Sequence, residues 1–136
     1  MKKYAILTVL VLAIMVTVTS CTKSSSSPVV YPERTFRFVL HTEKDFSGNT
    51  ENIVFSLFIR KANTANTVIF DSTLSPMQIK DIPNASKELV FEKKIADDGS
   101  DLTAGFLYAI QNVGNSWYID TCKSGVSLKV IDYSFQ

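Results

Sequence analysis

The sequence predicts an all-β domain, an antiparallel β-sandwich of seven to eight strands. Apolar and polar residues alternate with a period of two along most of residues 29–136, which is the pattern of strands with one buried face. No window in this region shows the 3.6-residue period of an amphipathic helix. Clusters of Gly, Asn, Asp, Ser and Pro separate the alternating runs, and short strands at such regular spacing favour a sandwich.

The first half of the domain contains four predicted strands, over residues 35–41, 53–60, 67–74 and 77–82. The first places Phe36, Phe38 and Leu40 on one face. The second carries apolar residues on both faces, which predicts a central strand. The third is bounded by a turn cluster, and the fourth alternates cleanly until Pro83.

The second half contains four more, over residues 87–95, 102–113, 116–121 and 126–135. The fifth strand alternates around Phe91, and the sixth holds Phe106 and Tyr108 on one face. The seventh is a short run between two Gly-containing turns. In the last, the alternation shifts phase between Val130 and Ile131, which predicts a β-bulge. A small lipocalin-like β-barrel is the alternative fold, although such barrels usually need longer strands.

The first 20 residues differ from the rest of the chain. Lys2 and Lys3 are followed by an almost unbroken apolar stretch of about 15 residues, shorter than the roughly 20 that a membrane-spanning helix needs. This layout is that of a secretory signal peptide. Residues 21–136 then carry 12 basic and 13 acidic side chains, so a strongly basic nucleic-acid binder is excluded.

The end of this segment, Val18-Thr19-Ser20-Cys21, resembles a bacterial lipobox. The resemblance implies that the chain is cut before Cys21 and that its thiol receives fatty acyl chains such as palmitate, which would anchor the protein in a membrane. The Ser-rich residues 21–30 then form a tether, and residues 31–136 form the domain. Thr22 in place of Asp favours the outer membrane. Whether the protein faces the periplasm or the cell surface stays undetermined.

If Cys21 carries lipid, Cys122 has no partner for an intrachain disulfide. A dyad of Cys122 with His41, the only histidine, is conceivable, but no local signature of a thiol hydrolase surrounds Cys122 and no G-x-S-x-G occurs. We therefore expect no enzyme activity, an inert half-buried cysteine and a surface histidine.

A cluster of acidic residues, Asp97-Asp98-Gly99-Ser100-Asp101, has the hard oxygen ligands that Ca²⁺ prefers. Its order does not fit an EF-hand loop, and an Asp-Gly pair between two strands favours a hairpin turn. One histidine and one free cysteine do not suffice for a zinc site. We expect neither a metal site nor a cofactor.

Aromatic residues are the most promising candidates for ligand contacts in the domain. The nine phenylalanines are assigned to the core. Trp117 and Tyr118 are adjacent on a strand and should point to opposite faces. The candidate ligand contacts, which would stack on a sugar or a peptide, are Tyr108, Trp117, Tyr118 and Tyr133, with Tyr31 as a further candidate for the platform.

The whole organisation resembles small lipoproteins of Bacteroidota that carry one immunoglobulin-like or transthyretin-like sandwich on a Ser-rich tether. The resemblance rests on the lipobox and on the strand pattern, and it implies no particular activity. The leading hypothesis is a lipid-anchored, non-enzymatic binding module of the cell envelope, with a protein or glycan as partner. The alternatives are a carrier of a small apolar ligand and a structural, fimbria-like subunit.

Overall fold

A computed structural model of the chain describes residues 31–62 and 67–136. The signal peptide predicted over residues 1–20, and the lipidated Cys21 with its tether, lie outside the described residues. Eight strands and one short 3₁₀ helix follow one another in the described residues: β1 (Glu33–Thr42), β2 (Asn52–Lys61), β3 (Val68–Thr73), β4 (Met77–Gln78), η2 (Ile79–Asp81), β5 (Leu89–Ala96), β6 (Leu102–Ile110), β7 (Gly114–Cys122) and β8 (Leu128–Phe135).

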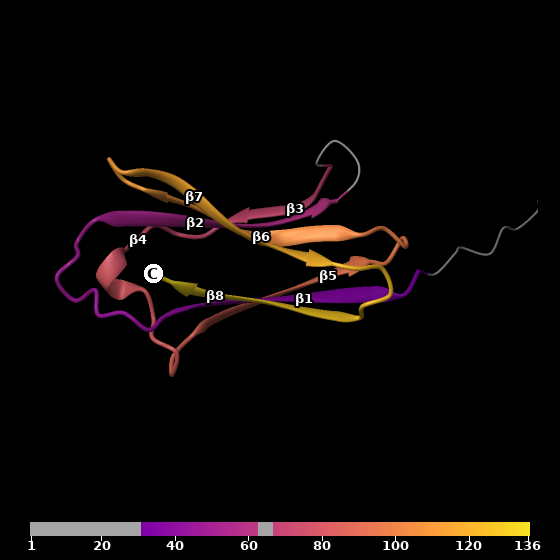
Figure 1. Cartoon of the computed structure of the whole chain (residues 1–136), viewed down its shortest axis with the longest axis horizontal. Helices are drawn as coiled ribbons and strands as arrows, with labels where there is room; N and C mark the ends of the chain where they lie inside the picture. Colours follow the sequence, from indigo (N-terminus) through magenta and orange to yellow (C-terminus); the bar gives the residue numbers. More distant parts are fainter. Residues whose placement is uncertain (1–30, 63–66) are drawn as a thin grey trace, which may run out of the picture. The chain divides into compact units, whose positions relative to one another are not determined.

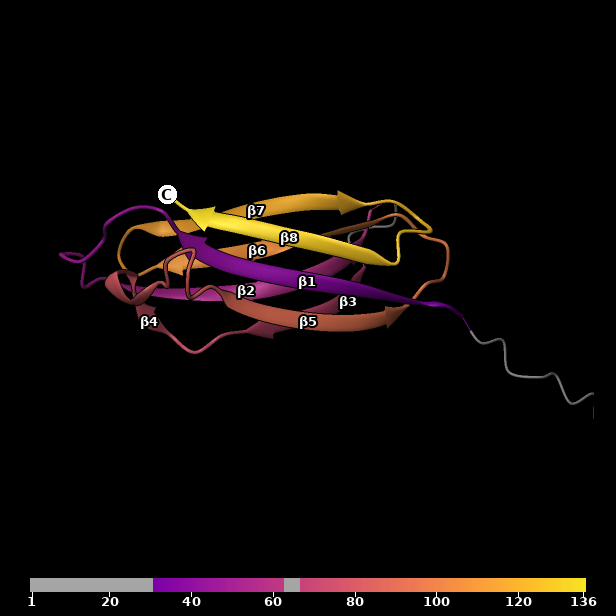
Figure 2. The same cartoon turned by 90° about the horizontal axis from the view of Figure 1, so that it is seen from below.

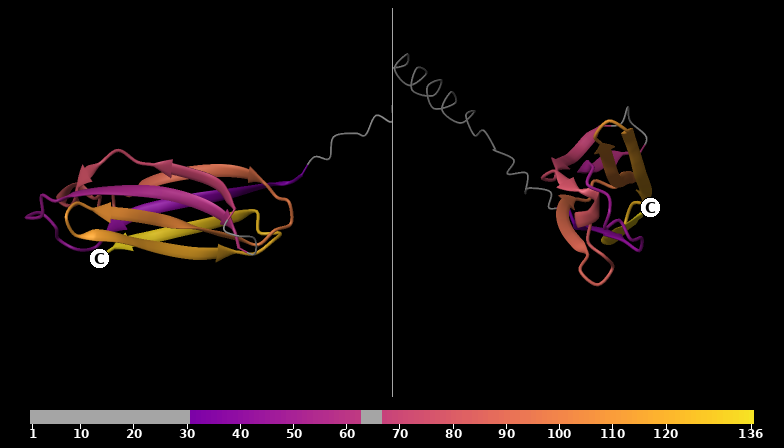
Figure 3. Two further views of the ribbon diagram at one scale, coloured as in Figure 1. Left: turned by 90° about the horizontal axis from the view of Figure 1, so that it is seen from above. Right: turned by 90° about the vertical axis from the view of Figure 1, so that its left-hand side faces the viewer.

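The strands form two sheets that lie face to face (Figure 1). Sheet A has the order β5-β1-β8, and its three strands run side by side in Figure 2. Sheet B has the order β3-β2-β6-β7, with β4 also paired to β2, and its strands face the viewer in the left panel of Figure 3. Among the described strands none pairs with a strand of the other sheet. The predicted β-sandwich is therefore confirmed, and the barrel alternative is wrong.

Strand β1 is the middle strand of sheet A and pairs differently on its two sides. It runs antiparallel to β5 and parallel to β8. The pairs of sheet B are all antiparallel. Immunoglobulin constant domains instead place the first, second, fifth and fourth strands together in one sheet. The pairing of the first strand with the last distinguishes this sandwich from that order.

The side chains that point inward, every second residue along the main strands, fill the space between the two sheets. Strand β1 contributes Phe36, Phe38 and Leu40, none of which has exposed surface. The rings meet edge to face, as for Phe38 and Phe106, whose centroids are 5.7 Å apart. Burying one such side chain stabilises the fold by about 1.5–3 kcal/mol relative to leaving it exposed. Strand β2 lies between β3 and β6, so its predicted central position is confirmed.

The fourth predicted strand is shorter than expected. Only Met77 and Gln78 pair with β2, and the chain then turns through η2. Ile79 and Ile82, three residues apart, are both buried. A single 3₁₀ turn aligns side chains at this spacing, so the alternation that suggested a strand here is satisfied by a helical turn.

The bulge predicted in the last strand is absent. Strand β8 pairs with β1 residue for residue, without a register shift. The apparent change of phase arises because Lys129 occupies an inward position while Val130, 44% exposed, points outward. The register shift in the described strands lies instead in β2 opposite β3, between Ile59 and Arg60.

Each open side of the sandwich holds a charged side chain that reaches across to the other sheet. On the β7–β8 side, Lys129 Nζ lies 2.6 Å from Asp120 Oδ2. On the opposite side, Lys93 of β5 places its Nζ 4.9 Å from the centroid of the Phe70 ring of β3. Inward-pointing charges on edge strands discourage pairing with a strand of another chain.

Candidate functional site

The four residues predicted as ligand contacts do not all come together in one site, although Tyr108 and Trp117 both line one hollow. Tyr108 of β6, Tyr118 of β7 and Tyr133 of β8 are half-buried and pack against the core between the sheets. Trp117 lies on the outer face of sheet B and is 65% exposed. The adjacent Trp117 and Tyr118 therefore do point to opposite faces. Tyr31, which is 53% exposed, precedes β1 and shares no ring contact with the other described aromatic residues.

The three tyrosines form a stack that closes the core on the β7–β8 side. Tyr133 lies in the middle, with its ring centroid 5.0 Å from that of Tyr118 and 5.9 Å from that of Tyr108. Burial, and secondarily the hydrogen bond with Tyr108, raise the pKa of the Tyr133 hydroxyl well above its ordinary value. The Tyr133 ring thus packs against Tyr108, Tyr118 and Phe106, so it is part of the packing.

The outward-pointing side chains of β7, β6 and β2 align in rows, because the register places them directly opposite one another. Two neighbouring rows combine large apolar side chains with short and uncharged ones. We name these six residues the Trp117 face; its rows are Trp117–Leu107–Ser56 and Asn115–Ala109–Val54.

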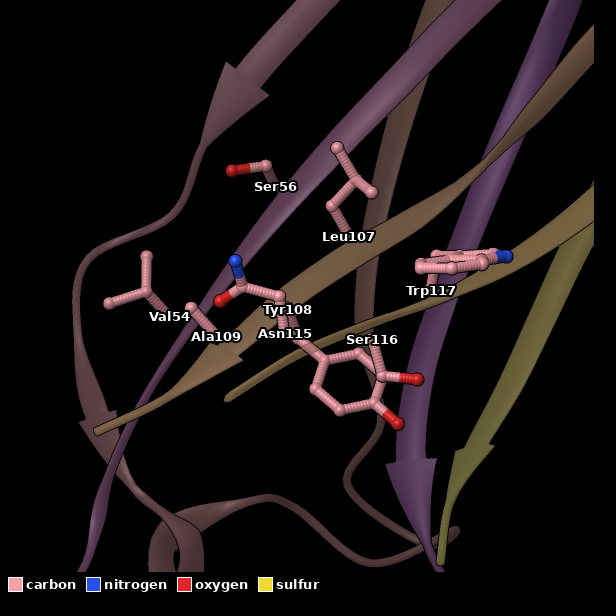
Figure 4. A pocket seen from close by; sticks show the side chains of 8 residues that line it. All are labelled: Val54, Ser56, Leu107, Tyr108, Ala109, Asn115, Ser116 and Trp117. Atoms are coloured by element: carbon pink, nitrogen blue, oxygen red, sulfur yellow. The ribbon is translucent and has the colours of Figure 1, made fainter. Parts of the chain in front are cut away.

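A hollow of about 210 Å³ lies on the Trp117 face (Figure 4). Figure 4 shows Leu107 and Trp117 leaving their strands on one side, while Tyr108 and Ser116 leave on the other. The short side chain of Ala109 lies between larger neighbours, which leaves the surface recessed there. A second hollow of about 430 Å³ shares Val54 and Ala109 with the first and extends towards Pro76.

The lining of both hollows is electrically neutral. None of the residues that line them carries a charge. Their polar groups include the side-chain amides of Asn52, Gln111 and Asn115. Asn52 Nδ2 donates a hydrogen bond to Gln111 Oε1 at 2.9 Å. The amide of Asn115 makes no hydrogen bond within the described part of the chain and remains able to donate and accept.

The row next to Trp117 contains Ile119, Gly105 and Phe58. Ile119 is 50% exposed and extends the apolar surface along β7. Phe58 is 2% exposed, and the Arg60 guanidinium lies 4.8 Å from its ring centroid. A Cβ at Gly105 would collide with the backbone carbonyl of Tyr118, so only glycine lets β7 approach β6 this closely.

The candidate nucleophile and base lie at opposite ends of the domain. Cys122 is 2% exposed and lies beside Arg34 at the start of β1, whereas His41 lies near the end of the same strand. Seven residues of extended strand separate Arg34 from His41, a distance of about 23 Å. Burial raises the pKa of the Cys122 thiol, an effect that Arg34 only partly offsets. A Cys122–His41 dyad is therefore excluded.

His41 itself is buried to 9% exposure, so the prediction of a surface histidine is wrong. Its Nε2 lies 3.0 Å from Asp132 Oδ1, across the parallel pair of β1 and β8. Its Nδ1 is buried without a hydrogen-bond partner among the described residues. The histidine is thus buried, and no nucleophilic side chain of the described residues is hydrogen-bonded to it.

The acidic cluster at residues 97–101 connects β5 of sheet A to β6 of sheet B, so it is not the hairpin turn that was predicted. Each carboxylate has a basic partner, and the hydrogen bond to that partner is the main cause that holds its pKa below its ordinary value. No group of three or more metal-ligating side chains gathers in the described regions. The pairs are Asp97–Arg34, Asp98–Lys61 and Asp101–Lys123.

The Trp117 face as a whole was missed by sequence reasoning, although one of its members was a candidate. A signal was present, because Leu107 and Val54 are apolar residues in the off-core phase of two strands. Such residues mark a strand with apolar side chains on both faces. The register needed to align them with Trp117 is a property of the folded sheet.

No protein-family model, curated protein or solved structure matches the chain. Within residues 31–62 and 67–136, no helix has the length and apolar character needed to cross a membrane.

Proposed function

We propose that this chain is a lipid-anchored protein of the cell envelope whose β-sandwich is a non-enzymatic binding module. Its binding surface is the Trp117 face of sheet B. The observation that carries the proposal is a tryptophan that is 65% exposed beside a recessed, apolar surface. Contiguous exposed apolar surface marks interaction sites, and tryptophan is enriched at the energetic centres of interfaces.

The anchor is proposed from the sequence alone. The segment Val18-Thr19-Ser20-Cys21 follows a basic start and an apolar stretch, which is the arrangement of a lipoprotein signal. Acyl chains on Cys21 would hold the protein in the outer membrane, because two or more chains are sufficient for stable attachment. The Ser-rich residues that follow would form the tether between the anchor and the domain.

Metabolic labelling with a palmitate analogue tests the anchor. We expect the full chain to incorporate the label and to fractionate with outer membranes. The Cys21→Ala variant should lose both properties. The Cys122→Ala variant, which removes the other cysteine, should keep both. Equal labelling of the Cys21→Ala variant would contradict the anchor.

Site-directed photo-cross-linking in cells tests the binding surface. A photoreactive residue is placed at position 115, on the Trp117 face, or at position 130, an exposed position on the outer face of sheet A. We expect covalent adducts from position 115 at least fivefold above those from position 130. Equal yields from both positions would reject the Trp117 face as the binding surface.

The two alternative functions have less support. A carrier of an apolar ligand needs an enclosed cavity of roughly 300 Å³ or more, whereas the two hollows described above are open to solvent on the outer face of sheet B. A fimbria-like subunit needs strand exchange through an edge. The inward charges of Lys129 and Lys93 at the edge strands oppose such pairing.

A further inference from the structure

We infer that the ligand of the Trp117 face is a neutral carbohydrate chain, with one sugar ring stacked on Trp117 and the chain crossing β6 and β2 towards Pro76. This inference rests on the proposed function and names its ligand class. It depends on three features: an exposed flat aromatic ring, a neutral lining and a path long enough for more than one sugar.

The chemistry of the lining fits a sugar better than an ion or a charged polymer. A sugar ring has apolar C–H faces and a rim of hydroxyl groups. Trp117 offers a flat ring to the C–H face, and Asn115, Asn52 and Gln111 offer amides that both donate to and accept from hydroxyls. Because no lining residue is charged, a phosphorylated or uronic ligand would find no counter-charge here.

The path across the sheet has the length of a short oligosaccharide. Trp117 on β7 and Ser56 on β2 are separated by two strand spacings, about 10 Å. The two hollows meet at Val54 and Ala109, so the recessed surface continues beyond this point to Pro76. The first hollow, about 210 Å³, is smaller than sites that enclose a whole drug-sized ligand. It therefore suits one ring of a chain that continues outside it.

A peptide is less suited to this place. An extended peptide gains affinity mainly by pairing its backbone with an exposed strand edge. The Trp117 face is the flat side of sheet B, where the backbone groups of β6 and β2 are already paired within the sheet. Only side chains are available there, and these fit a ligand whose polar groups are hydroxyls along its rim.

The experiment uses the full chain in a detergent without a sugar headgroup. The probes are neutral hexasaccharides of glucose, mannose, galactose and xylose, compared with a hexauronate and a neutral hexapeptide. Binding is measured by calorimetry and by the emission of Trp117, the single tryptophan of the chain. We expect at least one neutral hexasaccharide to bind and to shift this emission. Its Kd should change less than twofold between low and high salt, because no charged group lines the site.

Three variants assign the binding to this surface. Trp117→Ala should weaken it at least tenfold and Trp117→Phe by a smaller factor, because phenylalanine keeps a flat ring. Ala109→Leu should also weaken binding tenfold, because it fills the hollow without touching the indole. Val130→Ala, a matched exposed apolar position on sheet A, should leave the Kd unchanged.

Several results would overturn the carbohydrate assignment. These are the absence of binding by every neutral hexasaccharide, binding only of the hexauronate or the hexapeptide, and binding that survives Trp117→Ala. A dimer in sedimentation that Trp117→Ala dissociates would identify a second copy of the chain as the occupant. If cross-links from position 115 exceed those from position 130 but no sugar binds, the binding surface stands and only its ligand class fails.

Discussion

The outer face of sheet A and the Trp117 face of sheet B differ in chemistry. On sheet A, charged side chains pair with one another: Arg37 Nε donates to Glu92 Oε1 at 2.7 Å, and Lys94 Nζ lies 3.5 Å from Glu33 Oε2. Leu128 and Val130 remain exposed on the edge strand β8, and the residue opposite Val130 on β1 is Arg37 of the first of these pairs. On sheet B the two rows of the Trp117 face contain no charge and expose a tryptophan.

The difference shows why similar exposure has a different meaning on the two faces. The exposed Val130 lies opposite the charged Arg37, whereas Trp117 and Ile119 adjoin further neutral side chains in neighbouring rows. The charges of sheet A are already matched within the protein, so they have little left to offer a partner. The uncharged amides of sheet B are still able to bond to a ligand.

The largest effect on stability is expected at the row beside Trp117. Gly105→Ala places a Cβ against the Tyr118 carbonyl and should force β7 away from β6. We expect the free energy of unfolding to fall by about 2–3 kcal/mol, as for other overpacking substitutions. Urea unfolding followed by tryptophan fluorescence measures it. The control, Gly48→Ala, introduces a Cβ with no neighbour within 4 Å and should change the value by less than about 0.5 kcal/mol.

Acid should affect stability but not the Trp117 face. The pKa values of Asp97, Asp98 and Asp101 are lowered in the folded state, so their contribution to stability is present above the ordinary carboxyl pKa of about 4. This contribution to stability is lost as the pH falls below about 4 and through the lowered pKa values of the folded state. Urea midpoints measured from pH 7 to pH 3 should decline most steeply below pH 4, while sugar binding stays constant between pH 5 and 8.

Two variants separate this acid effect from a general response. Asp98→Asn removes one of the three paired carboxylates and should flatten the decline. Asp71→Asn, a carboxylate without an ion pair in the described segments, should leave its slope unchanged. An identical decline in wild type and Asp98→Asn would show that the Asp98–Lys61 pair contributes nothing.

The smallest effects are expected from single truncations on the outer faces. Arg37→Ala removes an exposed ion pair and should lower the free energy of unfolding by less than about 1 kcal/mol, with a smaller loss at high salt. Trp117→Ala should change it by less than about 0.5 kcal/mol at any salt concentration. Circular dichroism is the measurement, because the second variant lacks the fluorescent residue. A large loss from Trp117→Ala would instead assign this residue to the structural core.

The sequence predicts well the features that depend on alternation within one strand. The buried phase of β1 and the central place of β2 follow from the order of apolar residues. Alternation is less informative where a long charged side chain takes an inward position. Lys129 points inward because it forms an ion pair with Asp120 of β7. The resulting change in the alternation led to the incorrect prediction of a bulge in β8.

Features that depend on the strand register, or on which sheet a strand belongs to, could not be predicted from the sequence. The Asp-Gly loop crosses between the sheets, because β1 and not β6 is the partner of β5. Three candidate contacts, Tyr108, Tyr118 and Tyr133, stack in the core because the edge strand β8 of sheet A lies opposite the edge strand β7 of sheet B. Trp117 remained as a surface residue, and the neighbours that give it a role come from two other strands.

The double pairing of β1 also has a mechanical consequence. Any pull transmitted through the residues before Tyr31 enters the fold at the start of β1, and a force along this strand loads its hydrogen bonds to β5 and β8 together. Bonds loaded in parallel resist far more than bonds opened one at a time. At the same end, Arg34 forms an ion pair with Asp97 and donates a hydrogen bond to the Ser100 carbonyl, so β1 is also bonded to the loop between β5 and β6. If the domain were held by its N-terminus and pulled by a bound ligand, these bonds would therefore have to break together before the sandwich could open.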